Sequence, residues 1–157
     1  MANNRRQDSP DERHAAIDPE MLARAERAVA ALNEKFAASI EREIAELRDL
    51  IDRLAAAPDD DTVLKRIFDI AHDLHGQGGS FGYPLISRIG AALCRFIDPR
   101  DSASPAVPAA GVAALRVFTD AAAAVIAKNV TDEDDAVARA AVENLERLAD
   151  GAVRAPD

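Results

Sequence analysis

Apolar side chains recur every three or four residues along most of the chain from residue 19 onward, with Glu, Asp and Arg filling the positions between them. That spacing places the apolar positions on one face of an α-helix. No segment alternates apolar and polar residues as a half-buried β-strand does. The abundant Ala, Leu, Arg and Glu residues also favour helices, whereas β-branched and aromatic residues are scarce. We therefore expect an all-α protein.

The first apolar series, over residues 22–54, predicts an amphipathic helix that could extend unbroken from residue 19 to about residue 56. Asp18 is a suitable N-cap because a proline and an acid follow it. The length exceeds that of a usual globular helix, so a break near Asn33 or at residues 37–39 stays possible. Its Glu and Arg residues are typical of a solvated face, and a dimer seam is the less favoured interpretation.

Four further helices are predicted by the same periodicity, separated by residues that favour turns. Short connections between amphipathic helices indicate an antiparallel (up-down) four-helix bundle with an additional terminal helix. The expected helices are a second from the acids at 59–61 into the glycine-rich stretch 76–82, a third opened by Tyr83–Pro84 and ending at Ile97, a fourth over 109–128, and a fifth that begins at a capping box of Thr131 and Asp134 and ends at Asp150–Gly151.

The domain organisation follows from where this periodicity starts and stops. We expect a disordered leader over residues 1–17, a single helical bundle over 18–151 and a tail over 152–157. A linker rich in Ser, Ala and Pro covers residues 101–108 inside the bundle. A chain of 157 residues is long enough for one such domain.

The net charge of −9 narrows the classes of partner. Nucleic acids and anionic membranes are bound mainly through Lys and Arg, so neither is expected. We expect no apolar run to reach the ~18 residues of a membrane span. The single cysteine, Cys94, cannot form an internal disulfide, which fits a reducing compartment. We expect a cytoplasmic protein, monomeric in solution, without nucleic-acid or membrane partners.

The second helix carries the candidate chemistry. A projection at about 100° per residue places His72 on a flank that faces water, and His75 nearer the boundary of the core. Glycine within a helix costs about 1 kcal/mol relative to alanine, so Gly76, one turn after His72, needs a reason. Close approach of another macromolecule to the imidazole is such a reason. The residues that share this flank are Lys65, Gly76 and Gly79, with Asp69 beside them, whereas Leu64, Ile67, Ala71 and Leu74 define the expected buried centre.

Other interpretations of these residues are less favoured. The glycines of the stretch 76–82 look like a dinucleotide-binding loop, but that loop follows a strand and this one follows a helix. A metal site at His72, His75 and Asp69 would need facing acids, and the third helix has none. Cys94 and the five Phe residues are expected to pack in the core, and His14 is expected to be inert.

The residues around His72 resemble a motif of a known family. The run HDLHGQGGSFG, residues 72–82, is similar to the phosphoacceptor motif of histidine-containing phosphotransfer (Hpt) domains. The matching positions are His72, Leu74, Gly76 and Gly82, and His75 stands where lysine is usual. The close match extends through residues 93–98, which are similar to the Leu-Cys-x-x-Leu-Glu ending of the next helix. A looser likeness covers residues 35–128.

The resemblance implies a phosphoryl carrier and not an enzyme with kinase machinery. His72 would accept a phosphoryl group from the aspartyl phosphate of a receiver domain and pass it to another receiver. The implied partners are response-regulator receiver domains and a hybrid histidine kinase. The chain itself would need no cofactor, because the receiver brings its own Mg²⁺. The alternative is a helical bundle that binds a receiver or kinase as a scaffold, without phosphotransfer.

Auxiliary roles follow from the neighbourhood of His72. A nearby cation would neutralise phosphoryl charge, and we expect acids to avoid this face. Histidine is only partly charged near neutral pH, so His75 differs from the usual lysine in this respect. Gln77 or Ser87 could replace the helper acid or amide that the third helix lacks. The candidates are Lys65, His75, Gln77 and Arg88 as auxiliary residues, and Gly76, Gly79, Gly82, Phe81 and Tyr83 as the surface that meets the partner.

Overall fold

The structure is a computed structural model, and it describes residues 18–97 and 106–154. This part of the chain is helical and contains no strand, which confirms the all-α prediction. The helices are α1 (Pro19–Ala56), α2 (Asp61–Gly78), α3 (Pro84–Ile97), α4 (Ala109–Ala127) and α5 (Ala136–Arg154), with a 3₁₀ turn, η1 (Gly79–Phe81), between α2 and α3.

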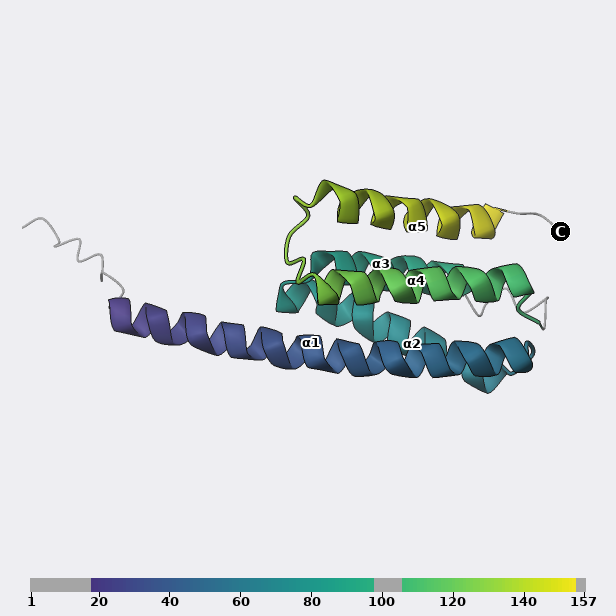
Figure 1. Cartoon of the computed structure of the whole chain (residues 1–157), viewed down its shortest axis with the longest axis horizontal. Coiled ribbons are helices and arrows are strands. Elements are labelled where there is room, and N and C mark those ends of the chain that lie inside the picture. Colours follow the sequence, from purple (N-terminus) through teal and green to yellow (C-terminus); the bar gives the residue numbers. More distant parts are fainter. Residues whose placement is uncertain (1–17, 98–105, 155–157) are drawn as a thin grey trace, which may run out of the picture.

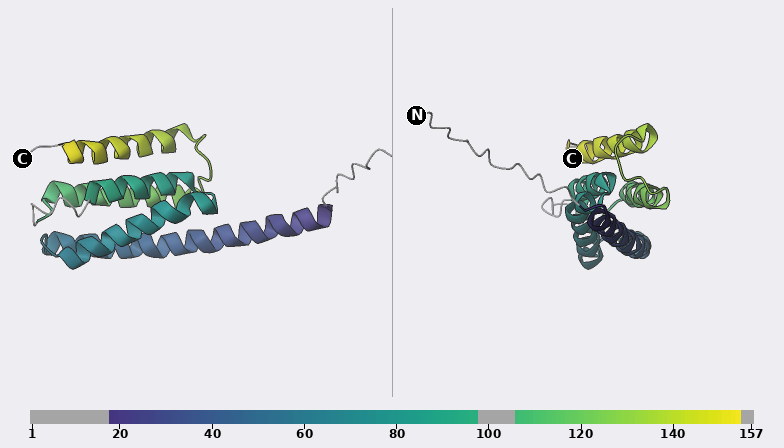
Figure 2. Two further views of the ribbon diagram at one scale, coloured as in Figure 1. Left: turned by 180° about the vertical axis from the view of Figure 1, so that it is seen from behind. Right: turned by 90° about the vertical axis from the view of Figure 1, so that its left-hand side faces the viewer.

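Successive helices run in opposite directions, as Figure 1 shows. The C-terminal part of α1 packs against α2 and α4, and α3 packs against α2 and α4 on the other side. Helix α5 lies mainly on α3, outside these four (Figure 2). The apolar faces of all five helices contribute to one core. The predicted bundle with an additional terminal helix is thus confirmed.

Helix α1 is one unbroken helix, so neither of the possible breaks occurs. Asp18 caps it, accepting a hydrogen bond from the backbone N–H of Glu20 at 3.0 Å. Its buried side chains begin at Phe36. Residues 19–35, which we call the α1 extension, project beyond the end of the bundle (Figures 1 and 2).

The start and end of α5 differ from the sequence prediction. Asp135 caps the helix by accepting hydrogen bonds from the backbone N–H groups of Val137 and Ala138. The capping box predicted at Thr131 and Asp134 is therefore wrong, because a carboxylate immediately before the helix offers the better cap. The helix also passes through Gly151, where a side chain would meet no atom within 4 Å, and continues to Arg154.

Helix α4 covers the expected residues to within one position, but it is more apolar than expected. Over Ala109–Ala127 it meets the length and mean hydropathy of a membrane span, which corrects the expectation that no segment would. Its apolar face, including Val112, Leu115 and Phe118, is buried against the other helices. Its two charged residues form ion pairs with α1, Arg116 with Asp52 at 2.7 Å and Asp120 with Arg48 at 3.3 Å. These contacts are those of a core helix of the bundle.

Some predictions fall on residues outside the described ranges. They are the disordered leader over residues 1–17 with His14, residues 101–105 of the linker, and residues 155–157 of the tail.

Candidate functional site

His72 lies on the exposed face of α2, as predicted, while the opposite face of the helix is buried. Its imidazole ring lies 6.5 Å from the ring of Phe68, one turn earlier, with the two planes inclined by 27°. The buried face is centred slightly differently from the prediction, because Val63 and Ile70 are buried and Leu64 is only half-buried. His72 is therefore fixed by its helix and open to solvent.

Two glycines continue the exposed face beyond His72. A Cβ atom built at Gly76 or Gly79 would meet no other atom within 4 Å, apart from its own helix and chain neighbours. The packing of the bundle therefore does not require glycine at either position. Both leave the side of the imidazole free for the close approach of another molecule, which is the property that the sequence predicted.

Two other glycines are required by packing, and the sequence analysis missed this role. A Cβ atom at Gly78 would lie 2.5 Å from the backbone nitrogen of Ser87, and one at Gly90 would lie 2.5 Å from that of His75. Real Cβ atoms essentially never approach backbone so closely. These two glycines allow α2 and α3 to cross in direct contact. A glycine in the middle of α3 was the available signal.

His75 is exposed, and not at the boundary of the core as expected. Its Nδ1 lies 3.2 Å from the backbone carbonyl oxygen of Ser87, within hydrogen-bonding distance. The Ser87 hydroxyl donates in turn to the His75 carbonyl oxygen at 2.5 Å. If Nδ1 of His75 carries the proton, it donates to the Ser87 carbonyl oxygen, and Nε2 remains free toward solvent. Ser87 thus orients the imidazole that stands one turn from His72.

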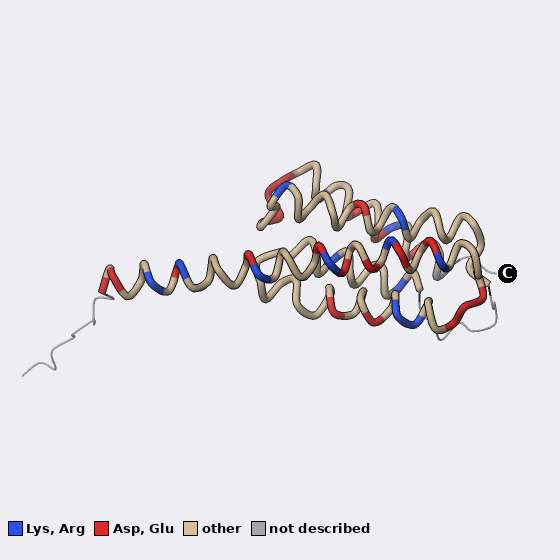
Figure 3. The backbone as a smooth tube through the Cα atoms, turned by 60° about the horizontal axis from the view of Figure 1, so that its bottom comes forward, with Lys and Arg blue, Asp and Glu red and all other residues tan. Residues whose placement is uncertain are grey.

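The charges around His72 correct the expectation that acids avoid this face. Asp69 and Asp73 lie within one turn of His72 on α2, and Nζ of Lys65 is paired with Asp69 at 3.2 Å. Asp69 comes four residues after Lys65, a spacing at which an acid and a base on one helix form an ion pair, and this pairing explains why Asp69 stands near His72. On the C-terminal side, residues 74–87 include no Asp, Glu, Lys or Arg. In Figure 3 the end of α2 and the following turn accordingly show neither the blue of Lys and Arg nor the red of Asp and Glu.

Arg88 does not belong to this face. Its guanidinium group forms two hydrogen bonds to the Glu146 carboxylate, at 2.8 and 2.9 Å, and a third to Glu133 at 3.1 Å. These bonds raise the pKa of Arg88 and lower that of Glu146. The arginine therefore holds α5 against α3, a contact that α3 alone could not reveal.

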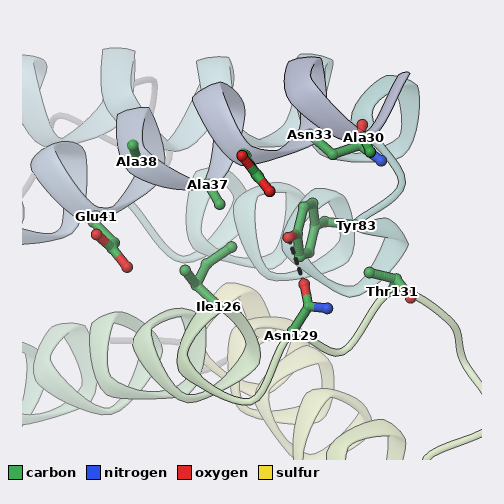
Figure 4. A pocket seen from close by; sticks show the side chains of 10 residues that line it. Ala30, Asn33, Ala37, Ala38, Glu41, Tyr83, Ile126, Asn129 and Thr131 are labelled. Carbon is green, nitrogen blue, oxygen red and sulfur yellow. Dashed lines mark hydrogen bonds between the residues drawn. The ribbon is translucent and has the colours of Figure 1, made fainter. Parts of the chain in front are cut away.

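Tyr83 is also placed away from the exposed face of α2. It is 3% exposed, and its hydroxyl group donates to the Asn129 side chain at 2.8 Å. Figure 4 shows that it faces a groove of about 510 Å³ between α1 and the end of α4, which does not include His72. Phe81 is half-buried and stacks on Phe36 at 4.5 Å between ring centres. Gly82 has a left-handed φ of +82°, which closes the turn before α3.

The remaining candidates have simpler surroundings. Gln77 is exposed on α2. Cys94 is half-buried on α3, and burial raises the pKa of its thiol to about 11, as expected for a packing residue. Within the described ranges no three His, Cys, Asp or Glu side chains are grouped so as to hold a metal ion.

Comparison with known proteins agrees with this geometry. Residues 34–151 match the family described as Hpt domain, which is most of the chain. No curated protein and no solved structure matches. The match begins at residue 34, two residues before the α1 extension gives way to the bundle, and includes α2, η1, α3, α4 and nearly all of α5. The family comprises helical bundles that carry phosphoryl groups on histidine in phosphorelay signalling and are not kinases. This chain belongs to the Hpt domain family.

Proposed function

We propose that this protein accepts a phosphoryl group on His72 from the aspartyl phosphate of a receiver domain and passes it to a second receiver. The observation that carries the proposal is the open face of α2: an exposed imidazole, with Gly76 and Gly79 beside it where packing does not require glycine. The uncharged run over residues 74–87 would let the acidic active site of a receiver approach from this side.

The chemistry needs little from this chain. A neutral imidazole nitrogen of His72 attacks phosphorus, so that an N–P bond forms while the P–O bond to the receiver's aspartate breaks and the carboxylate leaves. The second transfer is the same step in reverse onto another aspartate. Catalysis consists mainly of positioning and charge neutralisation. The receiver would contribute its Mg²⁺ and acids, so the Hpt domain contributes the nucleophile and the docking surface.

His75 is the auxiliary residue that the geometry favours. It is one turn from His72, exposed, and oriented by Ser87. Lys65 is two turns away and already paired with Asp69. Arg88 is paired with α5. We infer that His75 assists when both of its ring nitrogens are protonated: Nδ1–H donates to the Ser87 carbonyl oxygen, and Nε2–H donates to the transferred phosphoryl group and places a positive charge beside it.

The partners and the setting follow from this activity. We infer that receiver domains of response regulators and a hybrid histidine kinase bind this face in the cytoplasm. The surface that they contact would include Gly76, Gly79 and Gly82, together with the exposed edge of Phe81.

The test is transfer from a phosphorylated receiver with a radioactive phosphoryl group. The wild-type protein is expected to acquire an acid-labile, base-stable label, and His72→Gln is expected to abolish it. His75→Gln is the matched control, since it removes an exposed imidazole three residues along the same helix. That variant should keep the label and acquire it more slowly. A label that persists in His72→Gln would contradict the assignment of the phosphoacceptor.

A scaffold that binds receivers without phosphotransfer would give a different result. Wild-type protein would then bind the receiver, measured by calorimetry or sedimentation, and would acquire no label. Binding together with a label that depends on His72 excludes that alternative.

A further inference from the structure

The α1 extension, residues 19–35, has no role in the proposed phosphotransfer. It lies almost entirely before the part of the chain that matches the family, which begins at residue 34. Four of the seven exposed large apolar side chains in the described residues belong to it: Met21 (64% exposed), Leu22 (47%), Val29 (56%) and Leu32 (53%). Such a concentration on one short segment of α1 marks a surface that another molecule covers.

Three of these side chains form an ordered stripe. Leu22, Ala25, Val29 and Leu32 follow the alternating spacing of three and four residues that forms the seam between two paired helices. We call these four residues the apolar stripe. The next position in the series is Phe36, which stacks on Phe81 at 4.5 Å. The stripe therefore faces the same side of α1 as the bundle core.

This direction limits how a helix can cover the stripe. In a parallel pair of copies both helices would continue into their own bundles at the same end, beside the place where η1 packs against α1, so the two bundles would collide. In an antiparallel pair the N-terminal tip of each extension lies in the step where the other extension leaves its bundle, and the two bundles lie at opposite ends of the pair (Figures 1 and 2). A second copy meets this requirement by two-fold symmetry, because each extension fills the step beside the other.

The charge of the α1 extension is compatible with a second copy. Two chains that each carry a net charge of −9 repel one another. Within the extension the charges balance, since Glu20, Glu26 and Glu34 are matched by Arg24, Arg27 and Lys35. This segment can therefore approach its own copy without net repulsion.

We propose that the α1 extension is a self-association surface, through which two copies pair as antiparallel helices along their apolar stripes. The proposal does not depend on phosphotransfer, and it replaces the expectation of a monomer. At 1.5 Å per residue the extension is only about 25 Å long, so the interface is small and the dimer is weak.

The experiment is sedimentation of the full-length chain between about 1 and 200 μM, the range in which a weak dimer forms. The average mass is expected to rise from that of one chain toward that of two. Leu32→Glu should keep the mass at one chain throughout. Ala31→Glu is the matched control, because it adds the same charge one residue earlier on the far side of the helix, and it should still dimerise. Circular dichroism verifies that both variants retain their helix content.

The result that would overturn the proposal is a wild-type chain that stays monomeric at every concentration. The stripe would then be open to a different partner, such as a receiver domain. A dimer that Leu32→Glu and Ala31→Glu affect equally would overturn it as well, because the seam would then lie elsewhere.

Discussion

Two sides of α2 contain glycines for opposite reasons. On the side that faces α3, Gly78 and the α3 residue Gly90 stand where a Cβ would lie 2.5 Å from a backbone nitrogen. On the open side, Gly76 and Gly79 have free space around them. The fold requires the first pair. The second pair lowers the stability of the helix and allows no closer packing in exchange. Glycines that packing does not need, beside an exposed imidazole, are therefore a better indicator of a binding face than glycines between two packed helices.

The largest expected effect breaks the packed side. Gly90→Ala places a methyl group against the backbone of His75, which cannot move aside without displacing α2. We expect the free energy of unfolding to fall by about 2–3 kcal/mol, the usual cost of overpacking. Urea denaturation followed by circular dichroism measures it. An unchanged midpoint would show that the two helices can separate more easily than their contact suggests.

The corresponding change on the open side should have the opposite effect on stability. Gly76→Ala is expected to raise the free energy of unfolding by about 0.5–1 kcal/mol, because alanine favours the helix and meets no atom. Gly76→Leu should leave the fold intact and slow transfer from a phosphorylated receiver by at least about tenfold, since small misplacements of reacting groups are costly. If Gly76→Leu transfers at the wild-type rate, partners do not approach the imidazole from this side.

The sequence alone predicted the features that depend on nearby residues and missed those that depend on how the helices pack. Local patterns predicted the five helices, the Asp18 cap and an exposed His72, because each depends on neighbours within a few turns. The cap of α5 was misplaced by a competing carboxylate, Asp135, only a few residues away. The partners of Arg88 and of Tyr83 lie 58 and 46 residues along the chain. Such contacts depend on how helices are placed in space, and periodicity within one helix does not contain that information.

An effect on stability alone is expected on the far side of α3, where Arg88 and Glu146 join α3 to α5. Both side chains are 28% exposed, so their pair is worth about 1–2 kcal/mol. The hydrogen bonds from Arg88 lower the pKa of Glu146 below its ordinary value of 4.5. The stabilisation is therefore complete above that value and is lost as the pH falls through the lowered pKa.

Glu146→Gln should accordingly destabilise the protein at pH 7 and lose less stability between about pH 4.5 and pH 2 than the wild type does. Urea midpoints across this range provide the measurement. Phosphotransfer at pH 7 should be unchanged, since this contact is on the packed side. A slower transfer in Glu146→Gln would show that α5 influences the open face after all.

The smallest effect tests the boundary between the two sides, where Glu43 of α1 approaches Asp73 of α2. One carboxylate oxygen of Glu43 is buried without a hydrogen-bond partner, and burial together with the charge of Asp73 raises the pKa of Glu43. A raised pKa means that this carboxyl group favours folding when protonated and loses that contribution as the pH rises through its folded value. Glu43→Gln should therefore stabilise the protein at pH 7, by a few tenths to about 1 kcal/mol, and have no effect near pH 3.

Glu46, three residues further along α1, is the matched control for this boundary. Its carboxylate accepts two hydrogen bonds from Arg66 of α2, which lower its pKa, so Glu46→Gln should destabilise the protein at pH 7. Opposite signs for the two variants would show that the environment of each carboxylate decides the outcome, and not its position on α1. Asp73 is adjacent to His72, so phosphotransfer should be measured in both variants. If Glu43→Gln changes the rate of transfer while Glu46→Gln does not, the open face includes the edge of α2 that faces α1.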